Sequence, residues 1–215
     1  MGVRHDISAS LVQELLGRIG LSVSPLVADQ VCVYTALLRK WNERMNLTAL
    51  SDPVEILQTL FAESFLGAEL LQRDESPCLD VGSGAGFPGM AIKVYRPDLE
   101  MILMEPRQRK AAFLTAVKRE LGLNGVEILS CKLEAIQIAD FKNQPTVLIT
   151  RGVRDPLNIL LQGKHLLSGA RKVLLFTTPV LAISVRTGLK GIHWRAPLSV
   201  PWNTRHILLQ GQWIS

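Results

Sequence analysis

The chain has few cysteines and histidines and no long apolar run. Its 215 residues include only three cysteines, Cys32, Cys78 and Cys131, an odd and widely spaced set typical of free thiols in a reducing cytoplasm. The four histidines are scattered and none has metal-ligand spacing, so we expect no bound metal. The longest stretch without a charged residue, Val173–Val185, has 13 residues and is interrupted by Pro179, whereas a membrane span needs about 20. These absences exclude disulfide scaffolds and integral membrane proteins and indicate a globular, cytoplasmic chain.

Positive charge is concentrated in the second part of the chain. Residues 1–75 carry 6 Lys/Arg and 10 Asp/Glu, whereas residues 76–215 carry 18 Lys/Arg and 9 Asp/Glu. This imbalance fits a domain that binds a phosphate-rich partner. A basic soluble domain without such a partner has the same balance, so the charge leaves both interpretations open.

The first part of the chain has apolar residues at helical spacing. We expect three helices, over residues 11–19, Pro25–Asn46 and 52–71. Ser8 or Ser10 is a suitable cap for the first of them. The polar stretch 72–77 is the best boundary, so we expect a small helical region over residues 1–75.

After Pro77 the pattern changes to short apolar runs that alternate with amphipathic segments. The runs are 78–81, 101–104, 126–129, 147–149 and 173–176, and the helix patterns lie at 88–95, 107–121 and 155–167. This alternation predicts a doubly wound α/β sheet over residues 76–215. We interpret the tail, 192–214, as one or two closing strands, for which antiparallel pairing is an open alternative.

A glycine-rich turn, Val81–Gly89, follows the first predicted strand and precedes a helix. Glycines in such a turn let the backbone approach a ligand closely. Met90 stands where a nucleoside-triphosphate loop requires lysine. The residue two positions before Ser83 is valine, where a serine-hydrolase elbow requires glycine. Phosphoryl transfer and serine hydrolysis are therefore disfavoured.

Dinucleotide binding and S-adenosylmethionine binding remain for this turn. Its glycines fit G-x-G-x-x-G, but Pro88 lacks the backbone N–H that a pyrophosphate would use. Asp80, just before the turn, favours a ligand with a cationic amine and no phosphate, as in S-adenosylmethionine. Glu105 follows the second strand run, where a carboxylate can accept hydrogen bonds from both ribose hydroxyls. The alternatives are a loop-bracing role for Asp80 and a solvated strand-end acid for Glu105.

Two longer motifs carry a resemblance to a known family. They are Asp80–Gly89 and Trp41–Thr48, which matches the signature W-N-x-x-x-N-L-T. Shorter matches occur at 110–114, 133–134, 150–151 and 205–206. From about residue 11 to the C-terminus, the chain resembles the RsmG/GidB methyltransferases, which modify a guanine at N7 in bacterial 16S rRNA with S-adenosylmethionine.

The resemblance implies a Rossmann-like methyltransferase domain with a small helical N-terminal region. Together with the turn itself, it gives these expected cofactor-binding residues: Asp80, Gly82, Gly84, Phe87, Glu105, Leu133, Glu134 and Arg151. The expected RNA-binding residues are Arg107, Arg109, Lys110, Lys132 and Arg205. The expected partner is 16S rRNA in the small ribosomal subunit or an assembly intermediate, bound by a monomer.

Guanine N7 carries a free lone pair, so its methylation needs no general base. This agrees with the lack of a convincing His/Asp pair in the sequence. Catalysis would then come mainly from alignment of N7 with the methyl group. We expect Arg151 and Arg205 to be catalytic by holding the guanine or its phosphates.

Four positions depart from the family pattern. Leu60, Lys132, Gly152 and Thr177 replace a histidine, an arginine, an alanine and a lysine. These changes remove charge or hydrogen bonding near the expected RNA face. They leave two alternatives open: a catalytically impaired relative that binds cofactor or RNA, and a small-molecule methyltransferase on the same fold.

Overall fold

The protein is built around one mixed sheet. In the computed structural model, which describes residues 7–169 and 171–214, the strand order is β3-β2-β1-β4-β5-β8-β6, with β7 paired to β8. The strands are β1 Cys78–Val81, β2 Met101–Met104, β3 Val126–Leu129, β4 Val147–Arg151, β5 Lys172–Thr177, β6 Ile192–Trp194, β7 Leu198–Ser199 and β8 Ile207–Trp213. Strands β1 to β5 pair in parallel, and β8 runs antiparallel to β5, β6 and β7. The doubly wound sheet is confirmed, and the antiparallel alternative for the tail is correct, but the tail contributes three strands rather than one or two.

The first two predicted helices are confirmed, although the first begins two residues earlier and ends one residue earlier than expected. Helix α1, Ala9–Arg18, begins after Ser8, whose side chain accepts a hydrogen bond from the Leu11 N–H. Helix α2, Pro25–Met45, has proline in its first turn and ends at Asn46, which adopts the left-handed conformation with φ 47°.

The third predicted helix is continuous but changes its winding. It consists of α3, Pro53–Ile56, a π-helical segment, η1, over Leu57–Ala62, and α4, Glu63–Ala68. Asp52 caps its start. Such π segments occur often at functional sites, where side chains compete for backbone groups.

Helices cover both faces of the sheet. The crossover elements are α5 Gly89–Tyr95, α6 Gln108–Glu120, α7 Pro156–Gly163, α8 Pro179–Gly188 and the short 3₁₀ turns η2 Leu133–Ala135, η3 Ile138–Asp140 and η4 Lys164–Leu166. The sequence analysis did not predict α8, although Thr178 caps it and proline opens it. Within the described residues, no helix is both long and apolar enough to cross a lipid bilayer.

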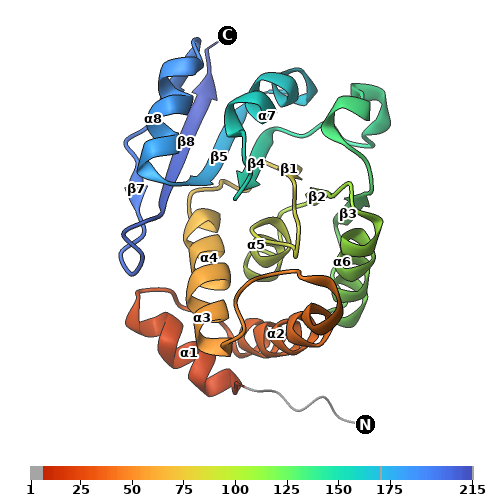
Figure 1. Ribbon diagram of the computed structural model, residues 1–215, viewed down its shortest axis with the longest axis vertical. Helices are drawn as coiled ribbons and strands as arrows, with labels where there is room; N and C mark the ends of the chain where they lie inside the picture. Colours follow the sequence, from red (N-terminus) through yellow and green to blue (C-terminus); the bar gives the residue numbers. More distant parts are fainter. Residues whose placement is uncertain (1–6, 170, 215) are drawn as a thin grey trace.

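Two apolar cores lie on opposite faces of the sheet. One joins the N-terminal helices with α5 and α6, and the other joins α7 and α8 to the second face. Figure 1 shows α1 to α6 gathered in the lower part of the view and α7 and α8 in the upper part. The helical region and the sheet thus share one core, which places α2 and η1 close to the carboxyl ends of the strands.

Candidate active site

The glycine loop, residues 82–88, follows β1 and is held by backbone bonds from below. The N–H groups of Gly82 and Ser83 both donate to the carbonyl of Met104, at 2.9 and 3.0 Å. Gly82, Gly84 and Gly86 have φ of +80°, +57° and +87°, a region that glycine adopts readily. The sequence prediction of a glycine turn at this position is confirmed.

The N-terminal helices support this loop with an aromatic side chain that sequence reasoning missed. The Tyr34 hydroxyl donates to the carbonyl of Ala85 at 2.7 Å, and its ring stacks on Phe87 with centroids 5.3 Å apart. A Cβ on Gly86 would overlap the Tyr34 hydroxyl. Phe87 also meets Phe61 edge-on at 4.9 Å. The Phe87 ring is therefore part of the core beneath the loop, and its contact with a cofactor stays a prediction.

Asp80 braces the loop. Its side chain is fully buried, and Oδ2 accepts a hydrogen bond from the N–H of Gly89 at 3.0 Å, at the start of α5. Oδ1 is buried and has no partner in the described structure. Burial raises the pKa of Asp80 to about 7, and the Gly89 N–H opposes that rise. The loop-bracing interpretation thus accounts for one oxygen of Asp80 and leaves the other without a partner.

Glu105 connects the end of β2 to the glycine loop. It is only 5% exposed, and Oε2 accepts from the Gly84 N–H at 3.0 Å. Oε1 accepts from the N–H of Arg107 at 2.9 Å. Two carboxylate oxygens have about four acceptor positions, so each keeps capacity for a ligand. The alternative of a solvated strand-end acid is wrong, because Glu105 is buried and fixed beside the loop.

Leu133 and Glu134 form the 3₁₀ turn after β3. Leu133 is buried in the core that lies under α7, whereas Glu134 is exposed. Cofactor contacts for both residues stay predictions.

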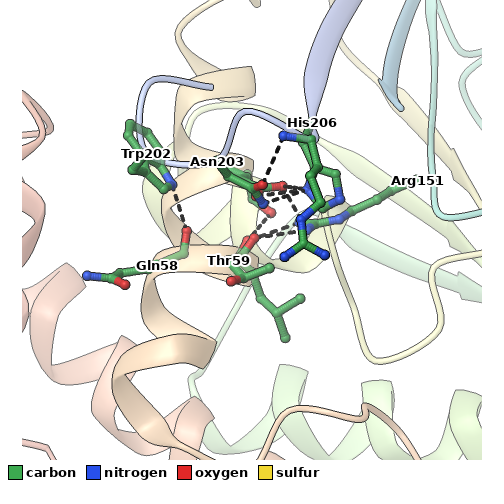
Figure 2. A network of polar contacts seen from close by, with 10 residues as sticks. Gln58, Thr59, Arg151, Trp202, Asn203 and His206 are labelled. Carbon is green, nitrogen blue, oxygen red and sulfur yellow. Dashed lines mark hydrogen bonds and ion pairs between the residues drawn. The ribbon is translucent and has the colours of Figure 1, made fainter. Parts of the chain in front are cut away.

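Arg151 lies at the end of β4, and its guanidinium is held by acceptors from the π-helical segment and from the first residue of α4 (Figure 2). Nη2 donates to Glu63 Oε2 at 2.8 Å and to the carbonyl of Thr59 at 2.9 Å. The guanidinium carbon is 5.9 Å from the centroid of the Phe176 ring. Burial lowers the pKa of Arg151, and the Glu63 carboxylate opposes that change.

Side-chain donors explain the widened turn of η1. Three consecutive carbonyls accept hydrogen bonds from outside the helix ladder: Gln58 from Trp202 at 3.0 Å, Thr59 from Arg151, and Leu60 from the Ser64 hydroxyl at 2.6 Å. Figure 2 shows the Trp202 and Arg151 bonds arriving at neighbouring carbonyls. The departure from α-helix is therefore the structural consequence of bringing Arg151 and the β7–β8 loop onto one helix.

Glu63 is the centre of a cluster that the sequence did not reveal. Besides Arg151, it accepts a hydrogen bond from Asn203 Nδ2 at 2.9 Å, and His206 Nδ1 lies 3.0 Å from both of its oxygens. The Asn203 amide nitrogen also lies 3.0 Å from His206 Nδ1, so the three side chains form one polar group. We name these four residues, Glu63, Arg151, Asn203 and His206, the Glu63 cluster. The sequence showed no convincing His/Asp pair, and the structure pairs His206 with Glu63 instead; this pair was missed because its members are 143 residues apart.

A cavity of about 110 Å³ adjoins the Glu63 cluster at the carboxyl ends of β4 and β5. Its lining includes Arg151, Val153, Phe176, Thr177, Leu181 and His206. The Thr177 hydroxyl is buried and unpartnered in the described structure. A Cβ on Gly82 would lie 3.3 Å from Val153 Cγ1, so the cavity is next to the glycine loop.

The expected RNA-binding residues do not form one group. Arg107, Arg109 and Lys110 lie together at the start of α6 and share a hollow with the end of α2. Lys132 is exposed after β3. Arg205 is exposed in the β7–β8 loop, where its backbone N–H donates to Asn203 Oδ1 at 3.3 Å. RNA contacts and catalytic roles for these residues stay predictions.

The residues around the glycine loop fit S-adenosylmethionine. A Cβ on Gly84 would meet nothing nearer than the Gly82 carbonyl oxygen at 3.8 Å, and one on Gly152 would meet nothing within 4 Å, so both backbones border open space. Asp80 has one buried carboxyl oxygen without a partner, whose charge would suit an amine nearby, and Glu105 keeps acceptor positions that would suit a ribose. Neither residue suits a phosphate.

The sheet order, the loop after β1 and the acid after β2 together define the fold of S-adenosylmethionine-dependent methyltransferases. The solved structure of a SAM-dependent methyltransferase from Aquifex aeolicus is similar, with a TM-score of 0.60 and 17% identity over 79% of this chain and 97% of that chain. A structure of MtNAS in complex with S-adenosylmethionine has a TM-score of 0.54 and 13% identity, over 96% of this chain and 78% of that chain.

The chain belongs to the GidB family, described as rRNA small subunit methyltransferase G, which matches residues 28–186. Ribosomal RNA small subunit methyltransferase G of Syntrophotalea carbinolica is 32% identical over 168 residues, 78% of this chain and 77% of that protein. The protein of the same name from Moorella thermoacetica is 36% identical over 138 residues, 62% of this chain and 57% of that protein.

Proposed function

We propose that this protein transfers a methyl group from S-adenosylmethionine to N7 of a guanine in 16S rRNA. The observation that carries the proposal is the position of Glu105, buried at the end of β2 and bonded to the N–H of Gly84. This position supports a role for Glu105 as a ribose acceptor beside a loop that has open space above its backbone. Membership of the GidB family supports the rRNA substrate.

When bound, S-adenosylmethionine supplies an electrophilic methyl on its sulfonium. The chain's own residues have three tasks in this proposal: Glu105 orients the ribose, the backbone of the glycine loop lies along the methionine part, and the Asp80 carboxylate favours its cationic amine. No residue needs to remove a proton, because guanine N7 has a free lone pair. The rate enhancement then depends on how well N7 is aligned with the methyl.

The cavity beside the Glu63 cluster is the proposed acceptor site. Its lining residue Val153 lies beside the glycine loop. The cavity also spans the ends of β4 and β5 and the start of β8, and two strand spacings, about 9.5 Å, separate β4 from β8. The unpartnered Thr177 hydroxyl and the Arg151 guanidinium border it and offer polar groups to a base edge. A catalytic role for Arg151 is supported by this position, and one for Arg205 by the neighbouring loop.

The proposed partner is 16S rRNA in the small ribosomal subunit or an assembly intermediate, reached in the cytoplasm by a monomeric enzyme. The test uses labelled S-adenosylmethionine and small subunits that lack the modification. We expect label in N7-methylguanine of 16S rRNA, and a large loss of transfer for Arg151→Ala. Cofactor binding without transfer would instead support an impaired relative, and label only in small metabolites a small-molecule enzyme.

A further inference from the structure

A groove between the end of α2 and the start of α6 is not used by the proposed chemistry. It comprises two hollows of about 560 and 550 Å³, which share Met45 and Arg109 in their linings. The lining residues that matter here are Lys40, Trp41, Arg44, Arg107, Arg109 and Lys110. We refer to it as the α2–α6 groove.

The α2–α6 groove carries unbalanced positive charge. Its lining has five cationic side chains and one acid, Glu43. In the part of the chain that the structure describes, none of the five has an ion pair, whereas Arg18, Arg96 and Arg151 each pair with a carboxylate. All five are exposed or half-buried. Unpaired cations on both walls of a groove are the arrangement that attracts phosphates.

The motif Trp41–Thr48 builds one wall of the groove. Asn42 Oδ1 accepts from the N–H groups of Leu47 and Thr48 at 2.6 and 2.9 Å, and its Nδ2 donates to the Thr48 carbonyl at 2.9 Å. Asn46 ends α2 in the left-handed conformation. These bonds fix the turn after α2, so Lys40 and Arg44 on the last turns of the helix keep their position beside α6.

Trp41 adds an aromatic surface. Its ring packs on Phe113 of α6 with centroids 5.6 Å apart, yet the side chain is only half-buried and lines the groove. A half-exposed indole between cations is a surface on which a nucleobase can stack.

The groove also connects to the cofactor side of the site. Glu105 Oε1 holds the N–H of Arg107, which lines the groove. Only Pro106 therefore separates Glu105, the proposed ribose-binding residue, from Arg107 in the groove wall. A polymer in the groove would lie next to the glycine loop.

From these contacts we infer that the α2–α6 groove binds the sugar–phosphate backbone of a single-stranded RNA segment that flanks the methylated base. Lys40, Arg44 and Arg109 contact phosphates, and Trp41 offers its ring to a base. The inference rests on the proposed function, because it assumes an RNA substrate. Single-stranded RNA fits this combination of cations and one aromatic face better than an acidic protein does.

The test compares two double variants that each remove two exposed cations. The variant Lys40→Ala with Arg44→Ala removes both cations from the α2 wall of the groove. The matched control is Arg186→Ala with Lys190→Ala, at α8 and the segment after it. Fluorescence anisotropy measures binding of a labelled, mixed-sequence oligoribonucleotide of about 12 nucleotides between about 50 and 200 mM salt. Calorimetry with S-adenosylmethionine checks that both variants keep the cofactor site.

We expect the groove variant to bind the oligoribonucleotide about tenfold more weakly and to lower the slope of log affinity against log salt by about 1.4, the value for two lost phosphate contacts on a single strand. The control should keep the slope of the unaltered chain. An equal loss in both variants, or an unchanged slope in the groove variant, overturns the inference. Weaker binding to small subunits with unchanged oligoribonucleotide binding overturns it in favour of a protein contact. Failure of methyl transfer with a normal salt slope contradicts the proposed function alone.

Discussion

The glycine loop and the Glu63 cluster border the same site but are held by different physical means. The loop is one continuous segment, fixed by backbone hydrogen bonds to Met104 and by the Tyr34 hydroxyl beneath it. The cluster joins three segments through a single buried carboxylate, which is 1% exposed and binds Arg151, Asn203 and His206. The conformation of the loop depends on glycines, which have no side chain, whereas the cluster depends on the negative charge of Glu63.

This difference predicts opposite sensitivities. A larger residue in place of a loop glycine should destabilise the loop, because these glycines have positive φ and some have close neighbours. Removal of the Glu63 charge should destabilise the cluster, because the Arg151 guanidinium would remain buried without the carboxylate that offsets its desolvation. Damage on the loop side should appear first in cofactor binding, and damage on the cluster side in transfer.

The largest expected effect is that of Gly86→Ala. The new Cβ would overlap the Tyr34 hydroxyl, and alanine at φ +87° is strained. Strain and overpacking together should lower the free energy of unfolding by about 4 kcal/mol, measured by urea denaturation. Gly84→Ala is the control, since its Cβ meets nothing nearer than 3.8 Å, and it should cost only about 1 kcal/mol. Equal losses of unfolding free energy in the two variants would contradict the inference that the Tyr34 hydroxyl excludes a side chain at residue 86.

Glu63→Gln should have the next largest effect. It keeps the shape of the side chain and removes the charge that faces Arg151 at 2.8 Å, so we expect a loss of about 3 kcal/mol in unfolding free energy. In conditions where the variant is folded, kcat for methyl transfer should fall at least tenfold while calorimetric affinity for S-adenosylmethionine stays unchanged. Glu63→Asp retains the charge and should recover part of the transfer rate. If Glu63→Gln instead lowers cofactor affinity and leaves kcat normal, Glu63 supports cofactor binding, and its assignment to methyl transfer is wrong.

The loop side could be predicted from the sequence because its information is local. The turn, its glycines and Asp80 lie within ten residues, and Glu105 follows the next strand run. The five parallel strands were recognisable because buried strands form continuous apolar runs. Each of these signals survives without knowledge of distant contacts.

The cluster could not be predicted because it is made by long-range contacts. Glu63 and Arg151 are 88 residues apart, and although the resemblance singled out Arg151, nothing in the sequence indicated Glu63 as its partner. The π-helical winding of η1 is equally invisible, because donors from β4 and the β7–β8 loop produce it. The motif Arg205-His206 was a further hint, but the resemblance drew attention to the arginine, whereas the structure brings His206 to Glu63.

A smaller effect is expected from pH, and it tests whether Asp80 takes part in binding. Burial raises the pKa of Asp80 to about 7, so the carboxyl is charged above that pH and neutral below it. A cationic amine prefers the charged form. Affinity for S-adenosylmethionine should therefore fall about tenfold between pH 8 and pH 6, in calorimetry at constant ionic strength. Asp80→Asn, which has no charge to lose, should give a flat profile; a profile as steep as that of the unaltered chain would exclude Asp80 as the source.

The smallest expected effect is that of Tyr34→Phe, which separates the two supports that one side chain gives to the loop. The substitution keeps the ring stacked on Phe87 and removes only the hydrogen bond to the Ala85 carbonyl. We expect a loss of about 1 kcal/mol in unfolding free energy and a several-fold weaker affinity for S-adenosylmethionine, because a buried carbonyl is left without its donor. The chain's other tyrosine is a matched control: the Tyr95 hydroxyl bonds to Glu69 at the surface, and Tyr95→Phe should leave cofactor affinity unchanged. If Tyr34→Phe lowers kcat without changing cofactor affinity, the helical region supports the acceptor side as well, and the division between the two halves of the site is weaker than their contacts indicate.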